Sequence, residues 1–406
     1  MLLDEPFAGL NRVAAEQVTS MLQRLKGDGI GGVIVEHEMA LLLPLLNPLK
    51  SLLVTLAVLL GALSLNLFVF HVGNLVLPLA SGLLLITVLF ALNMTYGYFV
   101  ETRGKRQITS LFGQYVPPEL VDEMSRNPES FSMEGESREM TVLFTDVRGF
   151  TRISEQFDPP GLTRFMNRFL TPMTELILSH GGTIDKYMGD AIMAFWNAPL
   201  DTPDHPARAC ATALAMQARL QDLNAEWEEE ARKEQRLHSP VNIGIGLNTG
   251  AATVGNFGSA QRLTYSCLGD EVNLASRLEG LCKLYGVGLI IGERTTEAVP
   301  GLAGLELDRV MVKGKTEPER ITALLGDADF ASKAQFAELS RKQAEFLEAY
   351  RRGAFVEALA TIDGCVAAAE AVGWRQGYYA MMRERVEGLI AEPPSEWTGV
   401  YVAKEK

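Results

Sequence analysis

Cysteine is scarce in this sequence of 406 residues, and none of its four cysteines lies in a CxxC spacing. That pattern argues against a disulfide framework or a cysteine zinc site, and it favours a reducing compartment. Positive charge is also in short supply, because 37 Lys and Arg residues stand against 50 Asp and Glu residues. The net charge of −13 argues against a general nucleic-acid binder, which needs a broad basic face. We therefore expect no nucleic-acid partner.

Residues 51–100 contain no Asp, Glu, Lys or Arg. A membrane-spanning helix needs ~20 apolar residues, so this run has room for two of them. We expect transmembrane helices at 49–70 and 75–100 that form a hairpin, so the expected partner of these two helices is the lipid bilayer. A hairpin buried inside a soluble domain is the alternative, and the length of the uncharged run disfavours it.

Basic residues flank the uncharged run on both sides. Lys50 precedes it, Arg103, Lys105 and Arg106 follow it, and the loop between the two expected helices carries no charge. The positive-inside rule then places both ends of the hairpin in the cytoplasm. The expectation is a multi-pass protein of the inner (plasma) membrane with both termini cytoplasmic. The acidic first ten residues have no basic segment that would open a cleaved signal peptide.

The length of 406 residues predicts two or more domains, and the fraction of 47% hydrophobic residues is typical of globular proteins. Outside the hairpin, the composition changes along the chain. A short cytoplasmic linker is expected at 101–136, and an α-helical tail rich in Ala, Glu and Arg at 331–391. Between them, residues 137–327 alternate strand and helix patterns in the order βαββαβ. This order predicts an α+β fold, with a ferredoxin-like sheet and its helices on one face.

Two carboxylates mark the ends of strand patterns in that region. Asp146 closes the apolar run MTVLFTDV, and Asp190 lies in the tight turn of KYMGDAIM. If the two strands pair, both side chains reach one spot at the edge of the sheet. Two carboxylates together with nucleotide phosphate oxygens make an all-oxygen site suited to Mg²⁺. Each aspartate taken alone is equally well explained by the preference of Asp for turns.

Further polar residues could bind and activate a phosphate. Phe150 and Thr151 open a helix soon after the first aspartate, and amides at a helix N-terminus suit a phosphate. Asn273 and Arg277 are spaced i, i+4, so they share one side of a later helix. Their donors suit the charge that grows on a reacting phosphoryl group. Without the other motifs, this pair is an ordinary solvated helix face.

Five motifs follow one another in residues 137–327: FTDVRGFT, KYMGDAIMAF, GIGLNTG, VGNFGS and YSCLGDEVNLASRLE. In these motifs and their order, the region resembles the catalytic domain of the class III nucleotidyl cyclases, the adenylate and guanylate cyclases. The resemblance implies that Asp146 and Asp190, helped by the backbone carbonyl of Val147, hold two metal ions, Mg²⁺ or Mn²⁺, at each active site. It also implies attack of the nucleotide's 3′-hydroxyl on its α-phosphate, with release of pyrophosphate.

The resemblance assigns the remaining roles residue by residue. Asn273 and Arg277 would stabilise the transition state, and Lys313 would hold the terminal phosphates. Lys186 and Ser266 fall at the two positions that read the purine in the family. Adenylate cyclases have Lys at the first position and Asp or Thr at the second, whereas guanylate cyclases usually have Glu and Cys. The expected substrate is therefore ATP and the product cyclic AMP, and a guanylate cyclase is the alternative within the family.

Assembly follows from the same resemblance. In the family the metal-binding aspartates come from one subunit, and the Asn, Arg and Lys come from the other. This chain carries each of these residues once, which implies a homodimer with two shared active sites. A catalytically silent nucleotide-binding scaffold at the membrane is the alternative from another functional class. The intact set of Asp146, Asp190, Asn273 and Arg277 argues against it.

The two ends of the chain carry weaker resemblances. Residues 1–39 resemble the end of an ABC transporter ATPase domain, with LLDEP and VEHEM as matching segments, but no GxxxxGK(S/T) phosphate loop occurs. We expect residues 1–40 to be a fused fragment without ATPase turnover, rather than part of a transporter. The membrane helices, the linker segment LFGQYVPPELVDEM and the tail resemble a bacterial membrane-anchored group of cyclases with an extracytoplasmic sensor domain.

Overall fold

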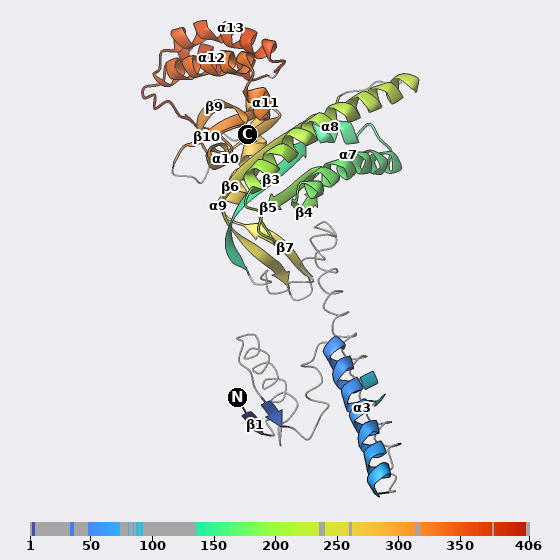
Figure 1. Cartoon of the computed structure of the whole chain (residues 1–406). Coiled ribbons are helices and arrows are strands. Elements are labelled where there is room, and N and C mark those ends of the chain that lie inside the picture. Colours follow the sequence, from blue (N-terminus) through green and yellow to red (C-terminus); the bar gives the residue numbers. More distant parts are fainter. Residues whose placement is uncertain are drawn as a thin grey trace. The chain divides into compact units, whose positions relative to one another are not determined.

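The structure is a computed structural model, and it describes two parts of the chain (Figure 1). One part lies within Met1–Gln107 and the other within Ile108–Lys406. The described residues are 2–4, 33–35, 48–73, 80, 84, 87, 88, 90, 91, 135–234, 240–259, 262–312, 317–375 and 377–402. Most of the expected fragment at 1–40, and all but the last two residues of the expected linker at 101–136, therefore lie outside the described residues.

In the first part, two short strands and one long helix are described. β1 (Leu2–Asp4) and β2 (Val33–Val35) pair in parallel, and α3 (Pro48–Gly73) covers the first expected membrane helix. Of the second expected membrane helix, at 75–100, only isolated positions are described. Over the described part of the chain, no helix combines the length and the apolar character that crossing a membrane requires. The described residues therefore do not support the expected transmembrane hairpin, which stays a prediction.

The second part is built around a ferredoxin-like sheet. Its first four strands are β3 (Glu136–Val147), β4 (Thr183–Met188), β5 (Ala191–Trp196) and β6 (Ile243–Ser259). They lie in the order β6-β3-β5-β4, and every neighbouring pair is antiparallel. Helix α7 (Pro159–Ser179) connects the first strand to the second, and α8 (His205–Lys233) connects the third to the fourth. The βαββαβ order that the sequence predicts is therefore present.

The alternation of side chains along β3 explains how the sheet is covered. Leu143 and Val147 are buried on one face against α7 and α8, which lie side by side (Figure 1). Met140 and Val142 are buried on the other face, where they pack against α9 (Asp270–Tyr285). The expectation of helices on one face thus holds for the two helices of the βαββαβ motif. It is wrong for α9, because the side chains of β3 are apolar on both faces.

A glycine lets α9 approach β6 closely. A Cβ at Gly246 would come within 2.2 Å of the backbone nitrogen of Glu279 and 2.4 Å of the carbonyl oxygen of Ala275. Only a residue without a side chain fits at that position without a shift of the helix. The motif GIGLNTG therefore sets the distance between the sheet and the helix that carries the predicted transition-state residues.

Five further strands bring the described sheet to nine. They are β7 (Arg262–Leu268), β8 (Leu289–Ile291), β9 (Ala303–Met311), β10 (Glu319–Gly326) and β11 (Tyr401–Val402). β7 pairs with the C-terminal end of β6. The other four strands continue the sheet from the edge of β6 that does not face β3, in the order β8-β10-β9-β11. The short helix α10 (Glu293–Ala298) follows β8. The βαββαβ strands and the C-terminal strand β11 thus share one sheet.

The C-terminal helices belong to this domain and are not a separate extension. They are α11 (Ala328–Ala331), α12 (Ala334–Arg351), α13 (Phe355–Ala371) and α14 (Tyr378–Ala391). Buried side chains of α12, α13 and α14 form one hydrophobic core with those of α9, β9 and β10. The helices expected at 331–391 are therefore present, but they pack against α9 and the sheet.

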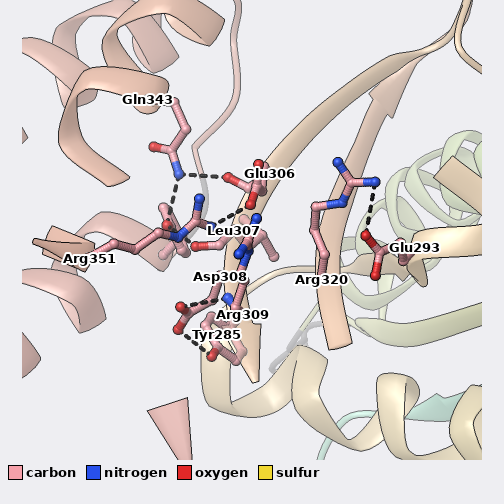
Figure 2. Close-up of polar contacts among 10 residues, drawn as sticks. Tyr285, Glu293, Glu306, Leu307, Asp308, Arg309, Arg320, Gln343 and Arg351 are labelled. Carbon is pink, nitrogen blue, oxygen red and sulfur yellow. Dashed lines mark hydrogen bonds and ion pairs between the residues drawn. The ribbon is translucent and has the colours of Figure 1, made fainter. Parts of the chain in front are cut away.

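Polar contacts also join these helices to β9 (Figure 2). Gln343 Nε2 on α12 donates to the carbonyl oxygen of Glu306 at 2.7 Å. The buried Asp308 carboxylate accepts from Tyr285 OH at 2.7 Å, as Figure 2 shows. It also accepts from Arg385 Nη1 at 2.7 Å. Tyr285 is the last residue of α9, and Arg385 lies on α14. One hydrogen-bond network therefore holds α9, β9 and the C-terminal helices together.

Candidate active site

Two carboxylates meet where β3 ends beside the β4–β5 turn. β3 runs to Val147 and pairs with β5 up to Thr145. Gly189 adopts the left-handed conformation in the turn, with φ 72°, and Asp190 follows it directly before β5. The Val147 backbone N–H donates to Asp190 Oδ2 at 3.3 Å. The structure thus brings Asp146 and Asp190 together at one end of the strand pair.

The electrostatics of this pair favour a cation. Burial and the negative charge of Asp146 raise the pKa of Asp190 to about 6. Both acids are partly exposed, and a hard divalent cation with oxygen ligands would remove their repulsion. Among the described residues, no three His, Cys, Asp or Glu side chains gather to hold a metal ion. The Val147 carbonyl and substrate oxygens would therefore have to complete the coordination.

An ion pair that sequence reasoning missed links this site to α9. Arg148 contacts the Glu279 carboxylate at 3.1 Å and donates to the Glu279 carbonyl oxygen at 3.0 Å. Burial raises the pKa of Glu279, the Arg148 charge opposes this shift, and the nearby Asp146 and Asp190 add to it. The ion pair lies against Gly244 of β6, where a Cβ would be 2.7 Å from Glu279 Oε1 and would force the pair to shift. Both residues lie within motifs, but a separation of 131 positions gives no sign of their contact.

The short helix α6 (Phe150–Ser154) follows the first aspartate, as the motif predicts. Gly149 precedes it with φ 68°, a left-handed conformation that favours glycine. Phe150 is half-buried and packs against the core under α7 and α8, whereas Thr151 is exposed. A phosphate contact at Phe150 and Thr151 would therefore come from the backbone N–H groups that begin this short helix.

Helix α9 carries the predicted transition-state residues on its outer side. Leu274 and Leu278 are buried in the core, while Asn273 is exposed and Arg277 is half-buried. Within the described ranges, no hydrogen bond or ion pair joins either polar side chain to the two aspartates of the same chain. Lys313 lies outside the described residues. Over the described residues, the structure of one chain therefore does not bring Asn273 and Arg277 to the carboxylate pair.

The two predicted purine-reading residues meet at a third residue, Asp185. Ser266 on β7 is buried and donates from Oγ to Asp185 Oδ2 at 2.5 Å. Lys186 on β4 is exposed, and its Nζ lies 3.2 Å from Asp185 Oδ1. The register of β4 against β5 shifts here, so Asp185 is an extra, bulged residue. Sequence reasoning missed Asp185, whose one signal is an acid at a buried position of the strand TIDKYM.

Comparisons with known proteins match the central part of the chain. Residues 133–322 match the family model described as the adenylate and guanylate cyclase catalytic domain. Adenylate cyclase 1 of Rhizobium meliloti (strain 1021) is 36% identical over 179 residues, which cover 44% of this chain and 26% of the relative. The adenylate cyclase of Anabaena cylindrica is 35% identical over 215 residues, which cover 51% of this chain and 41% of the relative. The chain thus spans less than half the length of these curated relatives.

Two solved structures each match about half of the chain. The adenylyl cyclase CyaB from P. aeruginosa is 33% identical, with a TM-score of 0.44, and the match covers 48% of this chain and 97% of that one. The guanylyl cyclase Cya2 is 35% identical, with a TM-score of 0.42, and the match covers 48% of this chain and 95% of that one.

Proposed function

Residues 133–322 belong to the adenylate and guanylate cyclase catalytic domain family, and we propose that this chain is an adenylate cyclase that converts ATP to cyclic AMP and pyrophosphate. The observation that carries the proposal is the meeting of Asp146 and Asp190 at the end of β3. Two curated relatives with this domain are named adenylate cyclases. A silent scaffold does not explain why the fold holds two acids against their mutual repulsion.

In the proposed reaction the 3′-hydroxyl of ATP attacks the α-phosphorus and pyrophosphate leaves. Two divalent ions, Mg²⁺ or Mn²⁺, held by Asp146, Asp190 and the Val147 carbonyl would lower the pKa of that hydroxyl and neutralise phosphate charge. By holding the cations, Asp146 and Asp190 would determine where the negative charge of the triphosphate is neutralised. Phe150 and Thr151 would contribute backbone N–H groups to a phosphate beside them.

Donors from later motifs would stabilise the reacting phosphates. We assign Asn273 and Arg277 to the negative charge that grows on the α-phosphate, and Lys313 to the terminal phosphates. Asn273 and Arg277 lie on the outer side of α9, a position that suits action on a phosphate bound by a second chain. The proposal is therefore a homodimer with two shared sites.

Lys186 and Ser266 would read the base. A lysine ammonium only donates, which suits the N1 acceptor of adenine, and a serine hydroxyl can accept from the 6-amino group. Guanine would place an N–H group opposite the ammonium of Lys186. The purine-reading residues therefore favour ATP over GTP.

We also propose that the chain is anchored in the inner (plasma) membrane, with its catalytic domain on the cytoplasmic side. What supports this is the absence of Asp, Glu, Lys and Arg from residues 51–100, with basic residues on both flanks. α3 leaves large apolar side chains exposed, among them Leu60, Leu67 and Phe68. Exposed apolar side chains on a long helix suit a lipid environment.

Full-length protein assayed with ATP or GTP and Mn²⁺ tests the enzyme proposal. We expect the wild type to form cyclic AMP. We also expect the protein to stay in the membrane fraction after alkaline extraction. Asp146→Ala and Asp190→Ala should each lose all but a few per cent of this activity, since each removes a metal ligand. Asp222→Ala, at an exposed position of α8, is the matched control and should keep it. Retained activity in both site variants would contradict the metal assignment.

The same assay tests the shared sites. A chain with Asp146→Ala mixed with a chain with Arg277→Ala should regain activity, because one site of each mixed dimer is then intact. No recovery in mixed dimers confirmed by cross-linking would show that each chain carries its own complete site.

A further inference from the structure

One buried acid beside the purine-reading residues has no part in the mechanism above. Asp185 lies on β4 with 1% of its surface exposed, next to Lys186 and against Ser266 of β7. We propose that Asp185 is a positioning residue that fixes the hydrogen-bond direction of Ser266 and so makes these residues select a 6-aminopurine nucleotide. This role rests on the adenylate cyclase function proposed above, and it states how that enzyme chooses its substrate.

Donors from two strands surround the Asp185 carboxylate. Its Oδ2 accepts from Ser266 Oγ at 2.5 Å and from the Cys267 backbone N–H at 3.3 Å. Its Oδ1 lies 3.2 Å from Lys186 Nζ. β4 pairs with β5, and β7 pairs with β6. Asp185 therefore forms a polar link between the two strands that carry the purine-reading residues, and the bulge in β4 frees it for that contact.

The direction of the Ser266 hydrogen bond follows from what each group can do. A hydroxyl has one proton to donate and two lone pairs, whereas a carboxylate only accepts. Ser266 must therefore donate its proton to Asp185. A second partner of Ser266 then finds only the lone pairs of the hydroxyl oxygen, so it has to be a donor. A hydroxyl without this acid could turn and offer either its proton or a lone pair. Lys186, beside the other oxygen of Asp185, only donates.

Adenine and guanine differ in the pattern that faces these two groups. Adenine offers an acceptor at N1 and a donor at its 6-amino group, which match one donor from Lys186 and one acceptor from Ser266. Guanine offers a donor at N1 and an acceptor at O6, the reverse at both positions. Because Asp185 takes the proton of the hydroxyl, Ser266 cannot donate to O6. The polar groups that a bound guanine would leave unpaired at these two positions then discriminate against it.

A purely structural role of Asp185 predicts a different outcome. An acid that only satisfies two buried donors would, on substitution, lower folding stability or total turnover and treat both nucleotides alike. A positioning role predicts a change in the ratio of the two products. The ratio of cyclic AMP to cyclic GMP is therefore the decisive readout.

Asp185→Asn tests the proposal, since the amide keeps the shape of the acid but donates as well as accepts. The full-length protein is given equal ATP and GTP, and we expect the ratio of cyclic AMP to cyclic GMP to fall about tenfold. The effect should vanish in a Ser266→Ala background, where no hydroxyl can turn. Asp222→Asn on α8 is the matched control and should leave the ratio unchanged. An unchanged ratio in folded, active Asp185→Asn would overturn the positioning role.

Competitive binding of ATP and GTP is the second measurement, and it does not depend on turnover. If the wild type forms neither product, the cyclase proposal fails, and a binding preference for ATP that Asp185→Asn removes still supports the positioning role. Should Asp185→Asn not fold, Ser266→Thr and Ser266→Ala decide the question. Thr keeps the hydroxyl and should keep the ratio, whereas Ala should lower it. Equal ratios in these two variants would overturn the proposal.

Discussion

The two carboxylates at the end of β3 repel each other at neutral pH, and this repulsion is measurable in the folding equilibrium. Burial and the charge of Asp146 raise the pKa of Asp190 from 3.8 to about 6. An acid with a raised pKa stabilises the folded state below its ordinary pKa, and that contribution is lost as the pH rises through about 6. Metal-free Asp190→Asn should therefore unfold at a higher temperature than the metal-free wild type at pH 8. The difference should shrink toward pH 4.5.

Thermal unfolding in EDTA measures this difference. Solvent screens the partly exposed pair, so we expect a gain of about 1 kcal/mol for Asp190→Asn at pH 8. Mg²⁺ should stabilise the wild type and leave Asp190→Asn nearly unchanged, because Asn brings no charge to the ion. Asp222→Asn, whose side chain is 73% exposed, should behave as the wild type does. An unchanged Tm for Asp190→Asn at pH 8 would show that the two acids do not repel each other.

Residues inside a motif could be predicted from the sequence, but their contacts could not. The motifs supplied the two aspartates and the two residues predicted to read the purine, and the structure brings each pair to one place. Asp185 was missed because its role depends on a one-residue bulge in β4, which no periodicity of the sequence reveals. Arg148 and Glu279 were missed because their contact depends on where α9 crosses β6.

At the scale of elements, the packing of α9 on β6 decides where Asn273 and Arg277 lie. Gly246→Ala should push α9 away, because the new Cβ would meet backbone atoms of Glu279 and Ala275, which cannot turn aside as a side chain can. We expect the free energy of unfolding to fall by about 1–3 kcal/mol and kcat to fall as well.

Urea unfolding and the cyclase assay measure the two effects. Gly280→Ala on α9 is the matched control, because its Cβ would meet nothing within 4 Å. Alanine in place of glycine inside a helix should stabilise the fold by about 0.5–1 kcal/mol and leave activity intact. Equal stability of the two variants would contradict the close packing of α9.

The order of elements could be predicted because strand and helix patterns have different periods. The predicted βαββαβ order is therefore confirmed, and the antiparallel arrangement β6-β3-β5-β4 matches it. The sequence did not show that α9 covers the opposite face of the sheet, because the apolar face of a helix does not indicate which surface it packs against. The expected membrane helix at 75–100 lies mostly outside the described residues and stays a prediction.

The C-terminal helices complete the hydrophobic core of the domain that contains the cyclase motifs. Their Ala-rich sequence predicts helices but not a docking partner, because the partner residues lie far away along the chain. β11 pairs with β9, and the Gly377 backbone N–H donates to the Gly286 carbonyl oxygen at 2.8 Å at the end of α9. Helix α9 is therefore fixed at its C-terminal end by the last part of the described chain.

The ion pair of Arg385 and Asp308 tests this docking, because both side chains are buried, with 10% and 0% exposed. Arg385→Met leaves the Asp308 carboxylate without its cation, which should lower the free energy of unfolding by about 3–5 kcal/mol at pH 7.5. Burial already raises the pKa of Asp308 and Arg385 opposes this shift, so the pKa rises further in the variant. Protonation then relieves the unpaired charge, and the loss should be smaller at pH 5.

Matched variants on the same helix separate docking from a general effect of α14. Arg383→Met removes an arginine whose partner, Asp363, is 85% exposed, and it should change stability by less than about 0.5 kcal/mol. Asp308→Asn combined with Arg385→Met should recover much of the loss, because no buried charge remains unpaired. Cyclase activity should follow stability through this series, since Tyr285 at the end of α9 donates to Asp308. If Arg385→Met is as stable as Arg383→Met in urea unfolding, the C-terminal helices do not hold the catalytic domain through this pair.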